Sequence, residues 1–421
     1  MRTPGTKCLA LERLRSKDTD NAVQCKLLGY EGDHIYRLVT TTGRLIRASS
    51  VQFAAKKRGL DDETLPSAPP PAPNEVTVRI TSTGLCGSDL HYYNHYCNGD
   101  IIVREPLILG HESCGYVTAV GPDAISLAVG DFVALEVGLP CGTCTLCAEG
   151  RYNICPDLRF RSSAKSWPHF QGTLQSEINH PADRCYKLTS TLDPRLGALI
   201  EPLSVAMHTH RRAALPTNST ILILGAGAVG LLCAAVAKAN GHRVIIADLQ
   251  PLRIDFATTN AFADAGFVVP LTPRGDVDAN LATAGTLASK LREKAKELGG
   301  VVDAVMECTG AEASLQIAIL AARPGGKVML VGMGTPVQTI PVSAAALREV
   351  DLLGVFRYAG VYRDAAKLVS EEKSGLPDLT KLVTHQFTGF GGVKEAFAMA
   401  GQAVDKRGRL VIKVVVEFPR E

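Results

Sequence analysis

The hydrophobic and polar residues of this chain follow different patterns in two neighbouring regions. Between residues 74 and 205 the apolar positions form short strand-like pieces, of which the clearest are EVTVRI (75–80), GYVTAV (115–120) and DFVALEV (131–137). Alternation with a period of two is typical of a strand that has one buried face. This region is therefore predicted to be rich in β-structure.

From Thr220 onwards, strand-like apolar runs alternate with helical segments. The expected strands are TILIL (220–224), RVIIAD (243–248), VVDAVMEC (301–308) and GKVMLVG (326–332), and helices are expected from Ala228, from Pro251 and after Gly310. This order predicts a parallel sheet with crossover helices. Beyond Gly354, a helical stretch and a last strand, RLVIKVVV (409–416), are expected to rejoin the β-rich region.

A proline cluster, LPSAPPPAP (65–73), separates both regions from the start of the chain. Consecutive prolines favour a stiff extended connection and exclude a helix or a central strand. Residues 1–63 contain twelve Lys and Arg against eight Asp and Glu, although the net charge of the whole chain is only +3. We therefore treat residues 1–60 as an atypical N-terminal extension.

The composition is that of a globular protein with two or three domains, because the 421 residues are 46% hydrophobic and 21% charged. Three glycines interrupt the apolar run 221–237, which favours a buried strand and helix over a membrane span. The N-terminal residues lack the continuous apolar core of a signal peptide. Twelve cysteines, some in CxxC spacing, favour metal ligation over disulfides, and we expect a cytoplasmic protein.

Gly225, Gly227 and Gly230 have the GxGxxG spacing between an expected strand and an expected helix. Glycines at these positions allow a tight turn and a close backbone approach to a pyrophosphate, which the helix N-terminus attracts. Asp248, at the end of the next strand, is suited to accept hydrogen bonds from the adenosine ribose. Because its charge would repel a 2′-phosphate, NAD is favoured over NADP. The alternative is a glycine-rich packing turn without a cofactor.

A second motif, CGTCTLCAEGRYNIC (141–155), brings Cys141, Cys144, Cys147 and Cys155 into one loop. Four thiolates without an interleaved His or carboxylate make a closed tetrahedral zinc site, which stabilises a fold and does not catalyse. The alternative is an iron–sulfur cluster, because ferredoxin runs also begin CxxCxxC and end in Cys-Pro. The last spacing is seven residues rather than three, which favours zinc.

Further candidate ligands lie in GLCGSDLHYY (84–93) and GHESCGYVTAVG (110–121), which contain Cys86, His111 and Glu112. One thiolate, one imidazole and one carboxylate would suit a catalytic zinc that keeps an open coordination position. By spacing alone, another interpretation is equally acceptable. His111 and Glu112 would then form an ordinary hydrogen-bonded pair, and Cys86 would be a small buried hydrophobe.

Taken in order, these motifs resemble the zinc-dependent medium-chain dehydrogenases, and within them the sorbitol, xylitol and L-arabinitol dehydrogenase group. The resemblance runs from Pro73 to Val415. It is also carried by GALIEPLSVAMH (197–208), ECTGAEASLQ (307–316), REVDLLGVFRY (348–358) and LVTHQF (382–387). It implies an α/β chain with a GroES-like β-rich catalytic domain (61–205 and 356–421) and a Rossmann domain with a doubly wound parallel sheet (206–355).

The resemblance further implies an enzyme that oxidises a polyol to a ketose and transfers hydride to NAD⁺. Its catalytic zinc would be bound by Cys86, His111 and Glu112, with Glu201 completing the shell or holding a zinc-bound water. The four-cysteine loop would hold a structural zinc. The residues implied to contact NAD are Gly225, Gly227, Val229, Gly230, Asp248, Arg253, Val331, Met333 and Phe356.

On the substrate side, the resemblance implies that Tyr92, Arg357 and Tyr358 approach the polyol. Ser88 and His91 are candidates to carry the proton outward, and Glu201 with its water is the rival route. A hydrogen bond that orders the loop is the alternative role for Ser88 and His91. The resemblance also implies a homo-oligomer, a tetramer, with a small polyol as partner and no membrane.

Two segments depart from the family. NHYCNGDI (94–101) replaces a Gly-Arg-Ile-Gly turn, which leaves the preferred polyol open. Residues 23–53 resemble a fragment of copia-type retrotransposon integrase, and their pattern predicts strands separated by turns at Glu31-Gly32-Asp33 and Thr42-Gly43. The charge of this extension is too small for a strong basic patch, so nucleic acid is not the expected partner. The alternatives are a dehydrogenase of another secondary alcohol or diol, an inactive homologue, or a nucleic-acid-binding fusion.

Overall fold

The chain forms two compact units. The computed structural model describes residues 7–11, 22–30, 36–40, 45–48, 51–52, 68–273, 275–371 and 374–418. One unit comprises Met1–Thr64 with Arg104–Pro106, and the other comprises Leu65–Val103 with Leu107–Glu421. The division between Thr64 and Leu65 lies at the first residue of the proline cluster.

The N-terminal unit contains a five-stranded antiparallel sheet with the order β4-β3-β2-β1-β5. Its strands are β1 (Lys7–Leu11), β2 (Ala22–Tyr30), β3 (Tyr36–Thr40), β4 (Leu45–Ala48) and β5 (Val51–Gln52). The strands expected within 23–53 are therefore present. The turns expected at 31–33 and at 42–43 lie outside the described residues.

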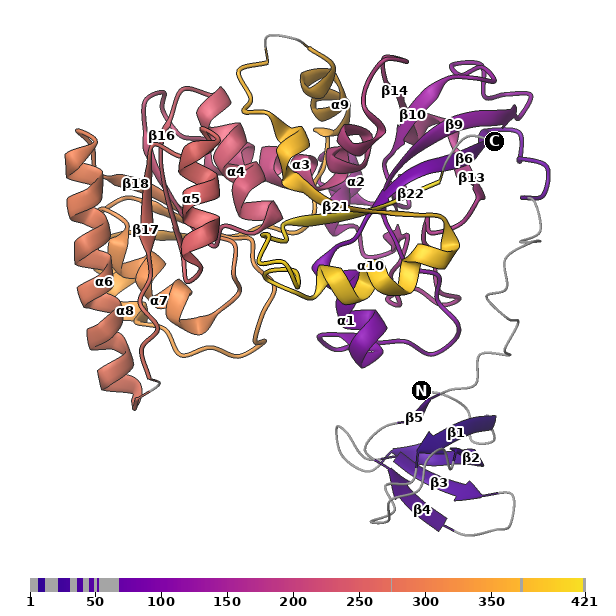
Figure 1. Ribbon diagram of the computed structural model, residues 1–421, viewed down its shortest axis with the longest axis horizontal. Coiled ribbons are helices and arrows are strands. Elements are labelled where there is room, and N and C mark those ends of the chain that lie inside the picture. Colours follow the sequence, from indigo (N-terminus) through magenta and orange to yellow (C-terminus); the bar gives the residue numbers. More distant parts are fainter. Residues whose placement is uncertain are drawn as a thin grey trace. The chain divides into compact units, whose positions relative to one another are not determined.

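A seven-stranded sheet forms the β-rich part of the second unit (Figure 1). Its long strand β6 (Glu75–Gly84) pairs along its length with β9 (Glu112–Val120). The sheet continues through β10 (Phe132–Leu135), β13 (Glu177–Pro181), β14 (Cys185–Lys187), β21 (Val383–Thr388) and β22 (Lys413–Glu417). Because β22 pairs with the end of β6, the prediction that the tail rejoins the β-rich region is confirmed.

The second sheet is six-stranded and entirely parallel, with the order β17-β16-β15-β18-β19-β20. Its strands are β15 (Thr220–Leu224), β16 (Arg243–Asp248), β17 (Ala265–Val268), β18 (Val302–Glu307), β19 (Lys327–Leu330) and β20 (Asp351–Gly354). The helices among them are α4 (Ala228–Ala239), α5 (Pro251–Thr259), α6 (Val277–Glu297), α7 (Glu312–Ala321) and α8 (Val342–Ala346). The prediction of a doubly wound parallel sheet is confirmed.

A 20-residue helix, α3 (Pro194–Ala213), connects the two sheets in sequence and packs against β9 on one side and α4 on the other (Figure 1). It begins favourably, because Asp193 accepts a hydrogen bond from the Arg195 amide and Pro194 occupies the first turn. Within the described ranges, no helix is both long enough and apolar enough to cross a membrane.

Four shorter helices also occur among the described residues of the second unit: α1 (Gly87–His95), α2 (Thr145–Ala148), α9 (Tyr362–Ser370) and α10 (Val393–Ala400). The helical stretch expected beyond Gly354 corresponds to α9. The segment 94–101, which departs from the family, contains the end of α1 and a small hairpin. That hairpin pairs β7 (Cys97–Asn98) with β8 (Ile101–Ile102).

Candidate active site and metal centres

Cys86, His111 and Glu112 lie together, with ligand atoms within 4.8 Å of one another. Cys86 immediately precedes α1 as its N-cap residue, and Glu112 is the first residue of β9. His111 and Glu112 are only 6% and 1% exposed. The residue before a helix and the residues at the start of a strand therefore lie together and form one cluster of a thiol, an imidazole and a carboxylate.

The carboxylate of Asp89 organises this cluster. Its Oδ1 lies 3.2 Å from His111 Nδ1 and accepts hydrogen bonds from the Gly110 amide and, at 2.6 Å, from the Ser162 hydroxyl. Its Oδ2 accepts from the Cys86 amide at 3.1 Å. Because Nδ1 of His111 is engaged by Asp89, Nε2 remains as the nitrogen available to a metal. Sequence reasoning missed this role, although Asp89 follows Cys86 by the three residues that capping at the third helical position requires.

Lys413 is the second residue that sequence reasoning missed. Its Nζ lies 2.8 Å from Glu112 Oε1 and 2.6 Å from Glu112 Oε2, and it also donates to the Leu85 carbonyl at 3.3 Å. Burial alone would lower the pKa of Lys413, but the Glu112 carboxylate outweighs this effect and raises it. A signal was present in the sequence, because Lys413 is the single charge inside the apolar run VIKVVV.

The donor set of this cluster suits a catalytic zinc ion. A soft thiolate, a borderline imidazole and a hard carboxylate are all ligands that zinc accepts, and three protein ligands leave a fourth position free. Lys413 offsets one of the two negative charges that Cys86 and Glu112 would bring. The cluster therefore fits the metal that the sequence led us to expect.

Glu201 lies inside α3 and is 4% exposed. It is not one of the three residues whose ligand atoms lie within 4.8 Å. Its carboxyl group nevertheless interacts electrostatically with His111, Glu112 and Lys413, and burial raises its pKa to about 7. Glu201 thus borders the cluster from the helix that joins the two sheets.

Arg357 is held in a left-handed backbone conformation, with φ of 52°. Its guanidinium carbon lies 3.6 Å from the centre of the Phe160 ring and 4.7 Å from that of Phe356. Burial lowers its pKa to about 10, and Glu201 and Cys86 are among the groups that counteract this effect. A half-buried cation therefore interacts electrostatically with one of the candidate zinc ligands and with Glu201.

Tyr358 and Tyr92 are both buried, at 3% and 5% exposure. The Tyr92 hydroxyl accepts a hydrogen bond from the Ala164 amide at 3.4 Å. The Tyr358 hydroxyl has no hydrogen-bond partner among the described residues. A buried hydroxyl without a protein partner is a group that a ligand or a water molecule can satisfy.

Ser88 and His91, the candidates for proton transfer, lie on α1. Ser88 is half-buried in the first turn of the helix. His91 is exposed, and its ring centre lies 5.9 Å from that of His95. Of the two, only Ser88 is therefore shielded from solvent.

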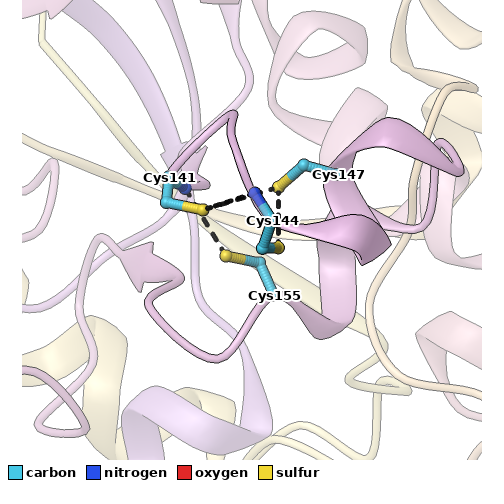
Figure 2. A group of neighbouring side chains, drawn as sticks. All are labelled: Cys141, Cys144, Cys147 and Cys155. Atoms are coloured by element: carbon cyan, nitrogen blue, oxygen red, sulfur yellow. Dashed lines mark hydrogen bonds between the residues drawn. The ribbon is translucent and has the colours of Figure 1, made fainter.

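The four cysteines of the loop 141–155 form a second cluster, with sulfur atoms within 4.8 Å of one another (Figure 2). Cys147 Sγ lies 3.5 Å from Cys144 Sγ and 3.9 Å from Cys141 Sγ. Sulfur atoms at the corners of a zinc tetrahedron are about 3.8 Å apart when each Zn–S bond is about 2.3 Å. The backbone amides of Thr143 and Cys144 stabilise the Cys141 thiolate and lower its pKa to about 6. The cluster fits a closed zinc site.

The glycine loop joins β15 to α4. Gly225 has φ of +96°, and a Cβ on Gly230 would lie 1.8 Å from the Gly225 carbonyl oxygen, so neither position tolerates a side chain. A Cβ on Gly227 would meet nothing within 4 Å. Gly227 is the N-cap residue of α4, so this open space lies at the helix N-terminus. The loop therefore leaves room for a pyrophosphate where the helix dipole favours it.

Asp248 follows on β16 and faces this loop. Its Oδ2 accepts a hydrogen bond from the Ala226 amide at 2.7 Å, and its Oδ1 accepts one from the Gln250 amide at 2.9 Å. Arg253 Nη1 lies 3.7 Å from Asp248 Oδ2, and the buried Nε of Arg253 has no partner among the described residues. Gly225, Asp248 and Arg253 line a pocket of about 760 Å³.

The other residues expected to contact NAD are partly or largely exposed. Val229 and Val331 are half-buried, whereas Met333 is 60% and Phe356 is 38% exposed. Exposed apolar side chains are compatible with a surface that a cofactor covers.

Comparison with known proteins identifies the family of two parts of the second unit. Residues 72–190 match the alcohol dehydrogenase GroES-like domain, and residues 228–371 match the zinc-binding dehydrogenase domain. The chain is 37% identical to sorbitol dehydrogenase of Arabidopsis thaliana over 350 residues, which cover 82% of this chain and 89% of that protein. It is 40% identical to D-xylulose reductase A of Aspergillus niger over 310 residues, covering 73% and 82%.

Solved structures show the same fold. An oxidoreductase of unknown specificity from Escherichia coli superposes with a TM-score of 0.71 at 30% identity, covering 84% of this chain and 94% of that one. L-Idonate 5-dehydrogenase of Escherichia coli superposes with a TM-score of 0.68 at 28% identity, covering 82% and 91%. The chain therefore belongs to the zinc-dependent medium-chain dehydrogenases, which makes it an oxidoreductase that uses zinc and a nicotinamide cofactor.

Proposed function

We propose that this protein oxidises a secondary hydroxyl group of an acyclic polyol to a ketone and transfers the hydride to NAD⁺. The substrate class agrees with the names of its relatives, which include a sorbitol dehydrogenase and a D-xylulose reductase. One observation carries the assignment. Arg357 interacts electrostatically with Cys86 and Glu201, and the buried Tyr358 hydroxyl, which has no hydrogen-bond partner among the described residues, interacts with Glu201 and Arg357, so polar groups are available for more than one substrate hydroxyl.

In this proposal Cys86, His111 and Glu112 hold the catalytic zinc, and Glu201 completes its surroundings directly or through water. Zinc in such a site acts as a Lewis acid that lowers the pKa of the substrate hydroxyl. Asp89 orients His111, and Lys413 holds the Glu112 carboxylate. The four cysteines 141, 144, 147 and 155 hold the structural zinc.

The remaining residues bind substrate and cofactor and exclude water. Arg357, Tyr358 and Tyr92 orient the polyol, and either Ser88 with His91 or Glu201 carries the released proton. Asp248 binds the adenosine ribose and disfavours a 2′-phosphate. The residues proposed to complete the NAD site are Gly225, Gly227, Val229, Gly230, Arg253, Val331, Met333 and Phe356.

The proposal extends to the organisation of the protein. Residues 61–205 and 356–421 would form the catalytic domain, residues 206–355 the NAD domain, and residues 1–60 an accessory extension. By family resemblance we propose a homotetramer, which sedimentation analysis would test. A cytoplasmic location is also part of the proposal, because a reducing compartment keeps the clustered thiols available as ligands.

The second candidate function is the oxidation of another secondary alcohol or diol, and the altered segment 94–101 is the observation that favours it. Initial rates with sorbitol, xylitol, L-arabinitol, galactitol, ribitol and 2,3-butanediol, each with NAD⁺ and NADP⁺, separate the two. The proposal predicts the highest kcat/KM for one of the five polyols with NAD⁺. A preference for the simple diol would instead support the second candidate.

A further inference from the structure

The segment 356–360 carries Arg357 and Tyr358 and is attached to the four-cysteine loop at both of its ends. Asn153 Nδ2 donates a hydrogen bond of 2.7 Å to the Phe356 carbonyl. The Gly360 amide donates one of 2.8 Å to the Tyr152 hydroxyl. Two consecutive residues thus hold the chain just before and just after the residues proposed to bind substrate.

Tyr152 and Asn153 are themselves fixed by the cysteine cluster and by a buried carboxylate. They lie in the short 3₁₀ turn Tyr152–Ile154, which leads directly into Cys155, and the Cys155 amide donates to the Tyr152 carbonyl at 3.1 Å. The Tyr152 hydroxyl donates to Glu136 Oε1 at 2.5 Å, and Glu136 is fully buried. The position of this turn therefore depends on the same loop that holds the four sulfur atoms.

The segment needs such support because its conformation is strained. Arg357 has φ of 52°, a left-handed backbone conformation that is unfavourable for a residue with a side chain. A pocket of about 530 Å³ lies beside the segment, lined by residues that include Asn153, Phe356 and Ala359. If its ends were released, the segment would have space to relax toward this pocket, and Arg357 would move relative to Phe160.

We propose that Tyr152 and Asn153 are positioning residues that hold the substrate-binding segment, so the structural zinc site contributes to substrate binding as well as to stability. The inference rests on the proposed function in taking Arg357 as a substrate-binding residue. Arg211 supports the segment from α3 by donating to the carbonyls of Ala359 and Gly360. Loss of one attachment should therefore loosen the segment without unfolding it.

The test compares Tyr152→Phe with Tyr186→Phe in the full chain loaded with zinc. Each variant removes one tyrosine hydroxyl that donates to Glu136, because the Tyr186 hydroxyl donates to Glu136 Oε2 at 2.8 Å. Of the two tyrosines, only Tyr152 also accepts a hydrogen bond from the Gly360 amide. Losing one hydrogen bond corresponds to a change of about tenfold. We expect Tyr152→Phe to raise KM for the polyol about tenfold with KM for NAD⁺ changed less than about twofold, and Tyr186→Phe to leave both near the unmodified values.

Asn153→Asp provides a second variant, because an isosteric carboxylate cannot donate to the Phe356 carbonyl. Phe356 also belongs to the proposed NAD site, so this variant should raise KM for both NAD⁺ and the polyol. Equal effects of Tyr152→Phe and Tyr186→Phe on KM for the polyol would overturn the inference. A Tyr152→Phe variant in which only kcat changed would also overturn it.

Amide hydrogen exchange supplies a readout that does not depend on turnover. The Gly360 amide should exchange roughly tenfold faster in Tyr152→Phe and at the unmodified rate in Tyr186→Phe. An unchanged Gly360 rate in Tyr152→Phe would overturn the positioning role even if the kinetics changed. If the unmodified protein oxidises no polyol but Gly360 responds as expected, the proposed function fails while the attachment of the segment stands.

Discussion

The ammonium group of Lys413 lies 2.6 Å from Glu112 Oε2, and both side chains are buried, at 4% and 1% exposure. The two residues are 301 positions apart and meet because β22 pairs with the end of β6, next to the start of β9. A buried charge without a partner is strongly destabilising. The last strand of the chain therefore supplies the counter-charge of a candidate zinc ligand.

In the zinc-free protein, Lys413→Met should lower the free energy of unfolding by about 3–5 kcal/mol, because it leaves the Glu112 carboxylate buried without its cation. Chemical denaturation measures this change. The double variant Lys413→Met with Glu112→Gln removes both charges and should recover part of the loss. A double variant as unstable as the sum of the two single variants would show that the pair does not interact.

Asp89→Asn tests the residue that orients His111. The amide group retains the size of the carboxylate but has only one acceptor oxygen for the donors of Cys86, Gly110 and Ser162. We expect the affinity for the zinc proposed at Cys86, His111 and Glu112 to fall about 10–100-fold, as measured by competition with a chelator. Retention of full zinc affinity would mean that Asp89 only caps α1.

Asp248 is expected to determine the choice of cofactor. Asp248→Ser removes the charge that would repel a 2′-phosphate, and the nearby Arg253 is then free to bind it. The ratio of kcat/KM for NAD⁺ over NADP⁺ should fall at least about tenfold. An unchanged ratio would contradict the assignment of Asp248.

His210 gives the stability a predictable dependence on pH. Burial and the neighbouring His242, whose Nε2 lies 2.9 Å from His210 Nε2, lower the pKa of His210 to about 4. Since an unfolded histidine titrates near 6.5, between these values the unfolded chain binds more protons. Stability should therefore fall as the pH drops from about 6.5 toward 4. His210→Gln should reduce the loss of Tm between pH 7 and 5 by roughly 2–3 °C, and an unchanged slope would contradict this explanation.

The sequence predicted those parts of the fold whose pattern is local. The strands β15, β16, β18 and β19 have apolar runs bounded by glycine or charge, and each was expected. Helix α3 was not expected, because Pro202 interrupts the pattern inside the helix. Strand β20 was missed as well, since its sequence DLLG is mostly exposed and lacks a clear period.

In the candidate site, too, the parts that lie within a short stretch of sequence could be predicted, and the parts that depend on distant segments could not. The glycine loop and the four cysteines lie within short segments, so spacing alone was informative. Grouping Cys86 with His111 and Glu112 required the family resemblance, because spacing left a second interpretation open. The roles of Asp89, Lys413, Tyr152 and Asn153 depend on contacts between distant segments, which periodicity does not reveal.

Zinc analysis of the folded protein tests the central claim most directly. The account predicts two zinc ions per subunit in the unmodified protein and one in His111→Ala, with turnover reduced roughly 10³-fold or more. Cys144→Ser should also retain one zinc ion, but with a lower Tm and measurable turnover. A single zinc ion in the unmodified protein, lost in Cys144→Ser and kept in His111→Ala, would contradict the account.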